Sequence, residues 1–473
     1  MREKLRKKHK LWRPGTISLG IVLVYIAIAV IPYAFVQNQP QDAYESLPVC
    51  QSSDYQANRA SLLTTGDEAL SARLRLIHNA RQDIVLANYI FIMDTSGIQV
   101  ASSLYQAAER GVKVSILLDG IIGLFNLLLD PTIQALAAHP NIEVRIYSPL
   151  NLFDPVSLNV RFHEKYMLVD GEWAIAGGRN VSDEFLMERD DVTNSIDLEV
   201  MLWKARQGIR DAVALLYEHF QNAWTSSNPW PSLGITTNAT RIAEQQQLLR
   251  FTQKSITKTA DLSPINAMDD MVLVDHIYLL TNTMEPRPKE PVLWNQLVSM
   301  MALATERVWV ISPYLILNQK MMSDLDNVAS STGNLHVLIN SVITGNNIPT
   351  SADYVLQKNC ICSAGFSTYE LFHENSLHTK AILIDDHLSA IGSFNFDMRS
   401  AYIDPEIMIV VDSCELNAML EEYMKDLWKN AQLVSGTQGS METMQGEPPY
   451  QNIPKTILIH FLAPIIHLIR YIL

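Results

Sequence analysis

The chain has 473 residues, enough for two to four domains or for one large duplicated domain. Hydrophobic residues make up 48% of it, so it can bury sizeable cores and is not disordered overall. Only 18% of the residues are charged and the net charge is −14, which disfavours binding to nucleic-acid backbones and suggests a connection with membranes. The four cysteines are too few for a disulfide scaffold.

Basic residues are concentrated at the start of the chain. Residues 1–13 carry a net charge of +6, which leaves −20 for the remainder. The next segment, from Ile17 to Val36, has twenty residues without a charge, and as a helix it would span the roughly 30 Å core of a bilayer. We predict a transmembrane anchor over residues 14–37 rather than a cleaved signal peptide, whose apolar region is shorter. The positive-inside rule then predicts a single-pass cell-membrane protein with 1–13 in the cytoplasm and, after a linker at 38–54, an extracytoplasmic catalytic domain.

Strands alternate with helices in two stretches of the chain. In the first, strand-like segments at 83–92, 113–118 and 142–147 accompany a helix at 99–110. In the second, strands at 307–311 and 336–339 accompany helices at 294–304 and 320–329. This alternation predicts an α/β fold with largely parallel sheets covered on both faces. We place the two lobes at 55–230 and 265–433, with an inter-lobe linker at 231–264.

The end of the chain is apolar. Residues 434–452 are polar and rich in Gly and Pro, which predicts a linker. Residues 453–473 carry only Lys455 and Arg470 as fixed charges, are interrupted by Pro464, and are marginal in length for a membrane span. We expect a helix that lies in the membrane interface. The alternative is a tail that packs on the globular core.

A motif is repeated between the lobes. The pattern H-x-K-x₄-D occurs twice with identical spacing, at His163, Lys165 and Asp170 and again at His378, Lys380 and Asp385. Each copy is followed by a glycine-containing pair and an asparagine, at Gly177, Gly178 and Asn180 and at Gly392, Ser393 and Asn395. An Asp-x-Glu segment follows in both lobes, at 197–199 and 404–406, and the first lobe has eight more residues before it. Because His and Lys lie two residues apart, an extended segment points both to one face, and two such copies predict one shared site.

These motifs resemble those of the phospholipase D superfamily over most of residues 60–430, and the segments HPNIEVRIYSP, GGRNVSDEF and GSFNFDMRS resemble bacterial cardiolipin synthases of the phospholipase D type. The resemblance implies a two-lobed fold with two similar mixed or parallel sheets, covered by helices and related by a pseudo-twofold axis, whose motifs meet at one pocket. It also implies a phosphohistidine intermediate. One imidazole attacks phosphorus, and the other protonates the departing alkoxide and then deprotonates the incoming alcohol or water.

By the same analogy, His163 is the nucleophile and His378 the acid and base. Lys165 and Lys380 offset the charge of the phosphate in place of a metal, so that no metal or other cofactor is implied. The expected phosphate-binding residues are Gly178, Asn180, Ser393 and Asn395. Asp170 and Asp385 are expected to orient other groups by hydrogen bonds, and Glu199 and Glu406 either to orient a histidine each or to be solvated acids. Two features depart from the commoner pattern: Gly178 replaces a serine, and one N-terminal span is found instead of two.

Three functions follow as hypotheses. The leading one is phosphatidyl transfer between phosphatidylglycerol-type lipids, which produces cardiolipin at a membrane. The second is hydrolysis of a phosphodiester by a phospholipase D or a nuclease, although the −20 outside residues 1–13 argues against a nucleic-acid partner. The third is an inactive lipid-binding protein, which the six intact H, K and D positions disfavour. The sequence leaves the oligomeric state open.

Overall fold

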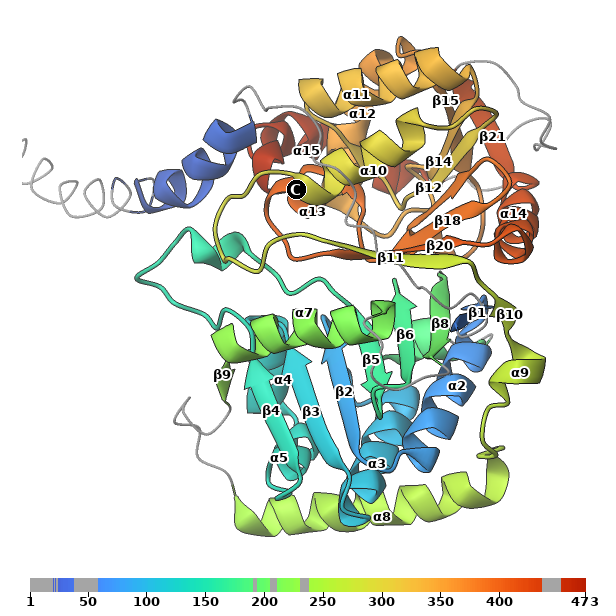
Figure 1. The fold of residues 1–473 in the computed structure, drawn as a ribbon. Coiled ribbons are helices and arrows are strands. Elements are labelled where there is room, and N and C mark those ends of the chain that lie inside the picture. The colour runs from blue at the N-terminus through green and yellow to red at the C-terminus, as the bar shows by residue number, and fades with distance from the viewer. Residues whose placement is uncertain are drawn as a thin grey trace, which may run out of the picture.

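The computed structural model describes residues 20, 22, 24–37, 58–189, 194–204, 211–229, 238–435 and 452–473. These residues form two α/β lobes, one above the other in Figure 1, each built around one main sheet. The basic segment 1–13, the predicted linker 38–54 and most of the predicted linker 434–452 lie outside the described residues.

Within the described part of the chain, the main sheet of the first lobe has nine strands in the order β10-β1-β8-β6-β5-β2-β3-β4-β9. Their bounds are β1 Asn58–Leu63, β2 Asp83–Asn88, β3 Lys113–Leu118, β4 Ile142–Ile146, β5 Tyr166–Val169, β6 Trp173–Gly177, β8 Glu199–Lys204, β9 Asn228–Pro229 and β10 Val272–Leu273. The second lobe has a sheet of eight described strands in the order β11-β20-β18-β17-β12-β14-β15-β21. These are β11 His276–Thr281, β12 Val308–Ile311, β14 Leu335–Asn340, β15 Ser367–Leu371, β17 Ala381–Ile384, β18 Leu388–Gly392, β20 Ile407–Asp412 and β21 Ala431–Ser435.

The two sheets follow one pattern, since their strand orders coincide once β1 is aligned with β11 and β5 with β17. Three neighbouring strands run parallel in each sheet, β2-β3-β4 and β12-β14-β15, and the strands beside them pair antiparallel. The predicted α/β fold with two similar mixed sheets is confirmed, but the expectation of largely parallel sheets is wrong. The strand after each H-x-K segment turns directly into a hairpin, and a short turn joins only antiparallel strands.

Helices cover both sheets (Figure 1). Their bounds are α2 Gly66–Asn79, α3 Thr95–Glu109, α4 Ile122–Leu129, α5 Pro131–Ala137, α6 Asp183–Leu186, α7 Ala212–Ser226, α8 Ala239–Thr259, α9 Ala267–Asp270, α10 Val292–Ala302, α11 Gln319–Thr332, α12 Ile348–Cys362, α13 Met398–Tyr402, α14 Cys414–Trp428 and α15 Ile453–His467. Between the lobes, α7 packs on β11 and α14 packs on β1, so one hydrophobic core continues from lobe to lobe.

The segment expected as an inter-lobe linker contains α8, which packs on α3 and α5 of the first lobe. Leu249, Gln253 and Ile256 form its buried stripe, at helical spacing in an otherwise polar sequence. Gln253 Oε1 accepts a hydrogen bond from Ser103 on α3 at 3.0 Å. Most of this stretch is therefore part of the helical layer of the first lobe.

The two ends of the described chain contact each other. Residues 24–37 are helical, Tyr33 is buried with its hydroxyl donating to the carbonyl of Val156, and the Gln37 side chain donates to the carbonyl of Tyr471 at 3.0 Å. None of the helices in the described ranges combines the length and the apolar character needed to cross a membrane. The predicted anchor 14–37 lies partly outside those ranges.

The C-terminal helix α15 packs on α12 of the second lobe. Ile459 and Ala463 are buried there against Ala352, and Lys455 Nζ donates to the carbonyl of Ile343 at 2.7 Å. The tail thus packs on the globular core through one face, which was the alternative expectation. Its outer face stays exposed.

Asp170 and Asp385 end the strands that follow the two H-x-K segments, both in a left-handed backbone conformation with φ of 54° and 51°. The Asp385 carboxylate accepts the backbone N–H groups of Thr305, Glu306 and Arg307, which lead into β12, and Asp170 does the same before β2. These aspartates therefore join each H-x-K strand to the start of its neighbour.

We expect Asp385→Ala to lower the free energy of unfolding by about 2–4 kcal/mol, because it leaves several N–H groups without an acceptor. Burial alone would raise the pKa of Asp385, but the N–H donors outweigh it and lower the pKa, so the loss should be present at neutral pH and shrink as the pH falls below the ordinary value of 3.8. Urea unfolding at several pH values measures it. The neighbouring Asp386 is exposed, and Asp386→Ala should change stability by less than about 0.5 kcal/mol. Equal losses for the two variants would contradict the assigned role.

Candidate active site

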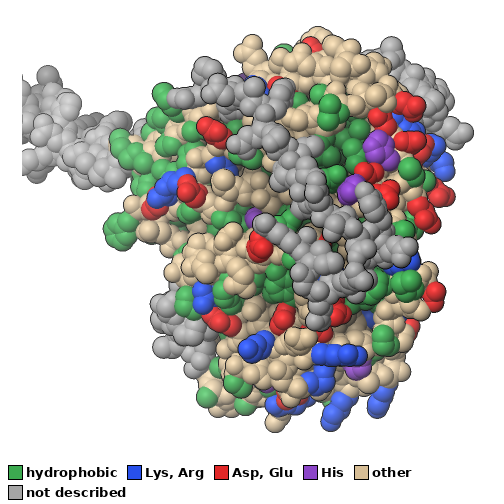
Figure 2. Space-filling model, in the orientation of Figure 1, with side chains coloured by type: hydrophobic (Ala, Val, Ile, Leu, Met, Phe, Trp, Pro, Cys, Tyr) green, Lys and Arg blue, Asp and Glu red, His purple; other side chains and the backbone are tan. Residues whose placement is uncertain are grey.

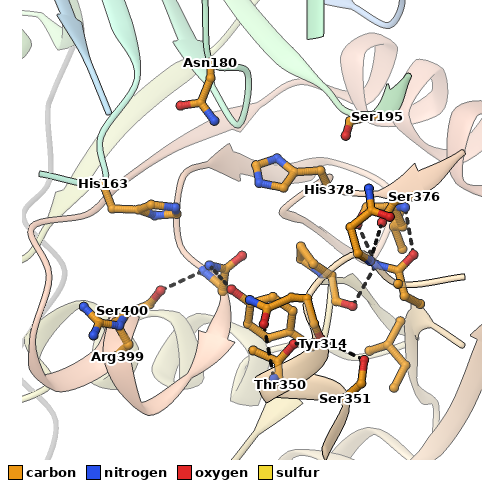
Figure 3. Close-up of a pocket in the computed structure, with 18 of the residues that line it drawn as sticks. His163, Asn180, Ser195, Tyr314, Thr350, Ser351, Ser376, His378, Arg399 and Ser400 are labelled. Atoms are coloured by element: carbon orange, nitrogen blue, oxygen red, sulfur yellow. Dashed lines mark hydrogen bonds between the residues drawn. The ribbon is translucent and has the colours of Figure 1, made fainter. Parts of the chain in front are cut away.

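A cavity of about 440 Å³ lies between the lobes and is lined by residues of both. His163 and His378 extend their rings into it, as Figure 3 shows, with 14% and 25% of their side chains exposed. The structure therefore brings together the two motifs, which are 215 residues apart in the sequence.

Each H-x-K segment lies immediately before its strand, β5 or β17, rather than on it. Alternation still holds in the first copy, where Glu164 points away from the cavity and accepts from His219 Nε2 on α7 at 2.7 Å. Lys165 lies on the same side as His163, with its ammonium 5.3 Å from the centre of the Tyr89 ring. Lys380 Nζ lies 3.0 Å from His378 Nδ1.

Each histidine is held by a carboxylate from the other lobe. His163 Nδ1 lies 2.8 Å from Glu406 Oε1, and His378 Nδ1 lies 2.6 Å from Asp197 Oδ2. Hydroxyl groups of Ser393 and Ser400 also donate to Glu406, whereas Asp197 accepts the backbone N–H of Leu198. Fixing Nδ1 in this way leaves Nε2 of each ring to act on a substrate.

The first lobe therefore uses the aspartate of its Asp-x-Glu segment and the second lobe uses the glutamate. Glu199, an expected supporting residue, contacts neither histidine and instead forms a buried two-point ion pair with Arg73 at 2.5 and 2.7 Å. Asp404, the counterpart of Asp197, accepts from Arg399 and from the backbone of Arg161.

Gly178 makes room for this arrangement. A side-chain carbon at Gly178 would lie only 2.2 Å from Asp197 Oδ1, so a serine there would displace the carboxylate. Just before Asp197, the first lobe forms β7 (Ser195–Ile196), which pairs with β16 (Ser376–Leu377) of the second lobe. That pairing places Asp197 directly beside His378.

The expected phosphate-binding residues divide into two groups. Asn180 and Asn395 line the cavity, and Asn395 Nδ2 donates to the Tyr314 hydroxyl at 3.1 Å. Gly178 and Ser393 are not among its lining residues: their N–H groups donate to the carbonyls of Leu198 and Ile407. Asp170 and Asp385 are also absent from the lining and act at the far ends of their strands.

Burial shifts the pKa values of the site. It lowers the pKa of His378 to about 3 and holds that of His163 well below its usual value, with the lysines adding to both effects. It lowers the pKa of Lys165 to about 7 and that of Lys380 to about 8. At neutral pH both imidazoles are therefore uncharged, and the two ammonium groups are close to losing their protons.

The two carboxylates also differ in charge state. Burial raises the pKa of Glu406 to about 7. Burial alone would also raise the pKa of Asp197, but the facing His378 and Lys380 outweigh it and lower the pKa. Asp197 is thus ionised at neutral pH, whereas Glu406 is about half protonated there.

Several lining residues were missed from the sequence. Tyr89 and Tyr314 follow the equivalent strands β2 and β12, a correspondence that the aligned strands could have revealed. Arg161 and Arg399 line the cavity beside His163. Their guanidinium groups donate to backbone carbonyls. Arg399 lies in the quoted segment GSFNFDMRS and Arg161 two residues before His163, so their positions next to the motifs could have indicated them.

A two-lobed α/β protein with one H-x-K segment from each lobe at a shared pocket is of the phospholipase D class. The sequence matches the family described as "Cardiolipin synthase, PLD-like domain" over residues 74–224 and 297–428, and the chain belongs to this family.

The similarity extends to named relatives. Cardiolipin synthase C of Escherichia coli is 27% identical over 426 residues, which cover 81% of this chain and 87% of that protein. Cardiolipin synthase A of Pectobacterium atrosepticum is 25% identical over 421 residues, 86% of this chain and 76% of the relative. Among solved structures, a phosphatidylserine synthase of Haemophilus influenzae superposes with a TM-score of 0.61 at 14% identity, covering 93% of this chain and 98% of that one, which shows a shared fold.

We expect Gly178→Ser to reduce the turnover of a phosphodiester substrate about 100-fold, since the added side chain pushes Asp197 away from His378 and misplaces the imidazole. Steady-state kinetics measure this. The control is a double-mutant cycle: in an Asp197→Ala background the same change should cost little more, because the group that it displaces is already gone. Additive losses would show that Gly178 acts in another way.

Proposed function

We propose that the protein is a membrane-anchored phosphatidyltransferase that joins two phosphatidylglycerol-type lipids into cardiolipin through a phosphohistidine intermediate. The observation that carries the proposal is the meeting of His163 and His378, each with its own carboxylate, in one cavity. Membership of the cardiolipin synthase family and the similarity to two proteins named cardiolipin synthase support the lipid substrate.

In the first step, His163 Nε2 attacks phosphorus and the bond to the leaving glycerol oxygen breaks. His378 gives its Nε2 proton to that oxygen. His378 is assigned as the general acid because the ionised Asp197 beside it stabilises the imidazolium form that donates the proton. The negative charge of a bound phosphodiester raises the pKa of His378, so the ring takes up a proton from solvent when the substrate binds.

In the second step, a hydroxyl group of another phosphatidylglycerol gives its proton to His378 and attacks phosphorus, and the bond to His163 breaks. Cardiolipin forms, and glycerol was released in the first step. Lys165, Lys380, Asn180 and Asn395 would stabilise the oxygens of the phosphoryl group in both steps. Water competes with the lipid hydroxyl, and the limited exposure of both histidines favours the lipid.

We further propose that residues 14–37 anchor the protein in the cell membrane and that the lobes, at 55–230 and 265–433, lie on the extracytoplasmic side. The +6 charge of residues 1–13 supports this orientation. The exposed apolar side chains of the N-terminal helix, such as Val24 and Phe35, support a lipid environment for this segment.

Incubation of the purified full chain with phosphatidylglycerol vesicles should yield cardiolipin and glycerol. His163→Asn and His378→Asn should each lower the rate at least about 1,000-fold, as expected for groups that take part in bond making and proton transfer. Lipid mass spectrometry identifies the products. Phosphatidic acid as the main product would overturn transfer in favour of hydrolysis.

A lipid with a p-nitrophenyl leaving group separates the two histidines, because its departure needs no acid. His378→Asn should still give a burst of p-nitrophenol and a phosphatidylated His163, and His163→Asn should not. The opposite pattern would make His378 the nucleophile.

The pH dependence of the rate should report the protonation of Lys165 and Lys380. We expect kcat/KM to fall as the pH rises through about 7–8, because the free enzyme then loses the ammonium charges of Lys165 and Lys380. The corresponding fall in kcat should lie at higher pH, since bound phosphate favours the charged lysines. Rates measured from pH 6 to 10 test this, and a kcat/KM that stays constant up to pH 9 would contradict it.

A further inference from the structure

Large apolar side chains are exposed along one edge of the first lobe. Three lie on α4 (Phe125, Leu128, Leu129) and three in the loop after β4 (Leu150, Leu152, Phe153), and we call these six residues the apolar edge. Leu129 is 75% exposed and Phe153 is 100% exposed. Figure 2 shows apolar side chains gathered on the side of the molecule from which the N-terminal helix extends. Large apolar side chains exposed in this way mark an interaction surface.

The two segments of the apolar edge leave the sheet together. β3 and β4 are parallel neighbours, so α4 and the loop after β4 both start at the same end of the sheet. They are in close contact there, because a side-chain carbon at Gly120 would lie 1.8 Å from the carbonyl oxygen of Ser148. The two segments therefore lie side by side where they leave the sheet.

The N-terminal helix lies against this loop. The Tyr25 hydroxyl donates to the carbonyl of Leu152 at 3.0 Å, and the Asn159 side chain donates to the carbonyl of Ala29 at 2.7 Å. The helix itself exposes Val24 by 60% and Ile31 by 59%. The apolar edge is thus continuous with the segment that we propose as the membrane anchor.

The outer face of α15 is apolar as well. Ile457, Phe461 and Leu468 are 64%, 73% and 77% exposed, on the side opposite to the buried Ile459 and Ala463. A helix that is apolar on both faces needs apolar surroundings on both. The main-chain carbonyl of Ile472, just after this helix, accepts from Arg399, a lining residue of the cavity.

The size of the cavity explains why such a surface is needed. At about 440 Å³ it holds a molecule the size of a phospholipid headgroup, so the acyl chains must lie outside it. We propose that the apolar edge inserts into a bilayer beside the N-terminal helix and that this contact holds the cavity at the lipid surface. This inference rests on the proposed lipid substrate and deepens it. Lipid is favoured over a second copy of the chain because the apolar edge adjoins the N-terminal helix, whose own side chains Val24 and Ile31 are 60% and 59% exposed.

The test compares Phe153→Asp with Phe251→Asp, a matched control on α8, where Phe251 is 72% exposed on the outer side of the first lobe. Each variant acts on phosphatidylglycerol in vesicles and on short-chain phosphatidylglycerol dissolved as monomers. We expect Phe153→Asp to lower the vesicle rate about tenfold or more, as for loss of one inserted aromatic side chain, and to leave the monomer rate within about twofold. Phe251→Asp should change neither rate. A normal vesicle rate for Phe153→Asp, or an equal loss on monomers, would overturn the proposal.

A second measurement needs no catalysis, so its failure is distinct from failure of the proposed function. F153C and F251C are made in a chain with C50S, C360S, C362S and C414S, and each is labelled with an environment-sensitive fluorophore. Phosphatidylglycerol vesicles should shift the emission of the F153C label to the blue and leave that of the F251C label unchanged. No shift at F153C, or equal shifts at both positions, would overturn docking through the apolar edge even in an active enzyme.

Discussion

The site depends on two imidazole–carboxylate contacts that cross between the lobes. Glu406 of the second lobe holds His163, and Asp197 of the first lobe holds His378. Both carboxylates are fully buried, and a buried charge that loses its partner costs several kcal/mol. Because neither lobe alone can supply both members of a pair, the docked lobes are the smallest unit that holds the site. The continuous core between the sheets keeps them docked.

The duplication is used asymmetrically. Both lobes carry an Asp-x-Glu segment, but the first presents Asp197 and the second presents Glu406. Gly178 and the β7–β16 pairing bring the shorter acid to His378, while Ser393 keeps the longer one at His163. The two histidines therefore stand beside acids of different charge state, which suits them to different parts in one reaction.

The proposed chemistry sets opposite demands on the surroundings. Transfer to a lipid hydroxyl requires little water at the histidines, whereas two large lipids must reach them. A small cavity between the lobes meets the first demand. The apolar edge, the N-terminal helix and the outer face of α15 offer a way to meet the second, since they would leave the acyl chains in a bilayer while only the headgroups enter.

The sequence by itself determined the duplicated α/β organisation, because hydrophobic periodicity is a local property of the chain. It also determined the H-x-K segments and their shared site, because the same spacing occurs in both copies. It did not reveal that α8 belongs to the first lobe, since three buried residues in a polar helix give a weak signal. It also pointed to Glu199 where the structure uses Asp197. Only the tertiary structure decided that choice, because Asp197 and Glu199 lie on one short segment. Asp197 contacts His378 because Gly178 leaves room for its carboxylate and because β7 pairs with β16 of the other lobe.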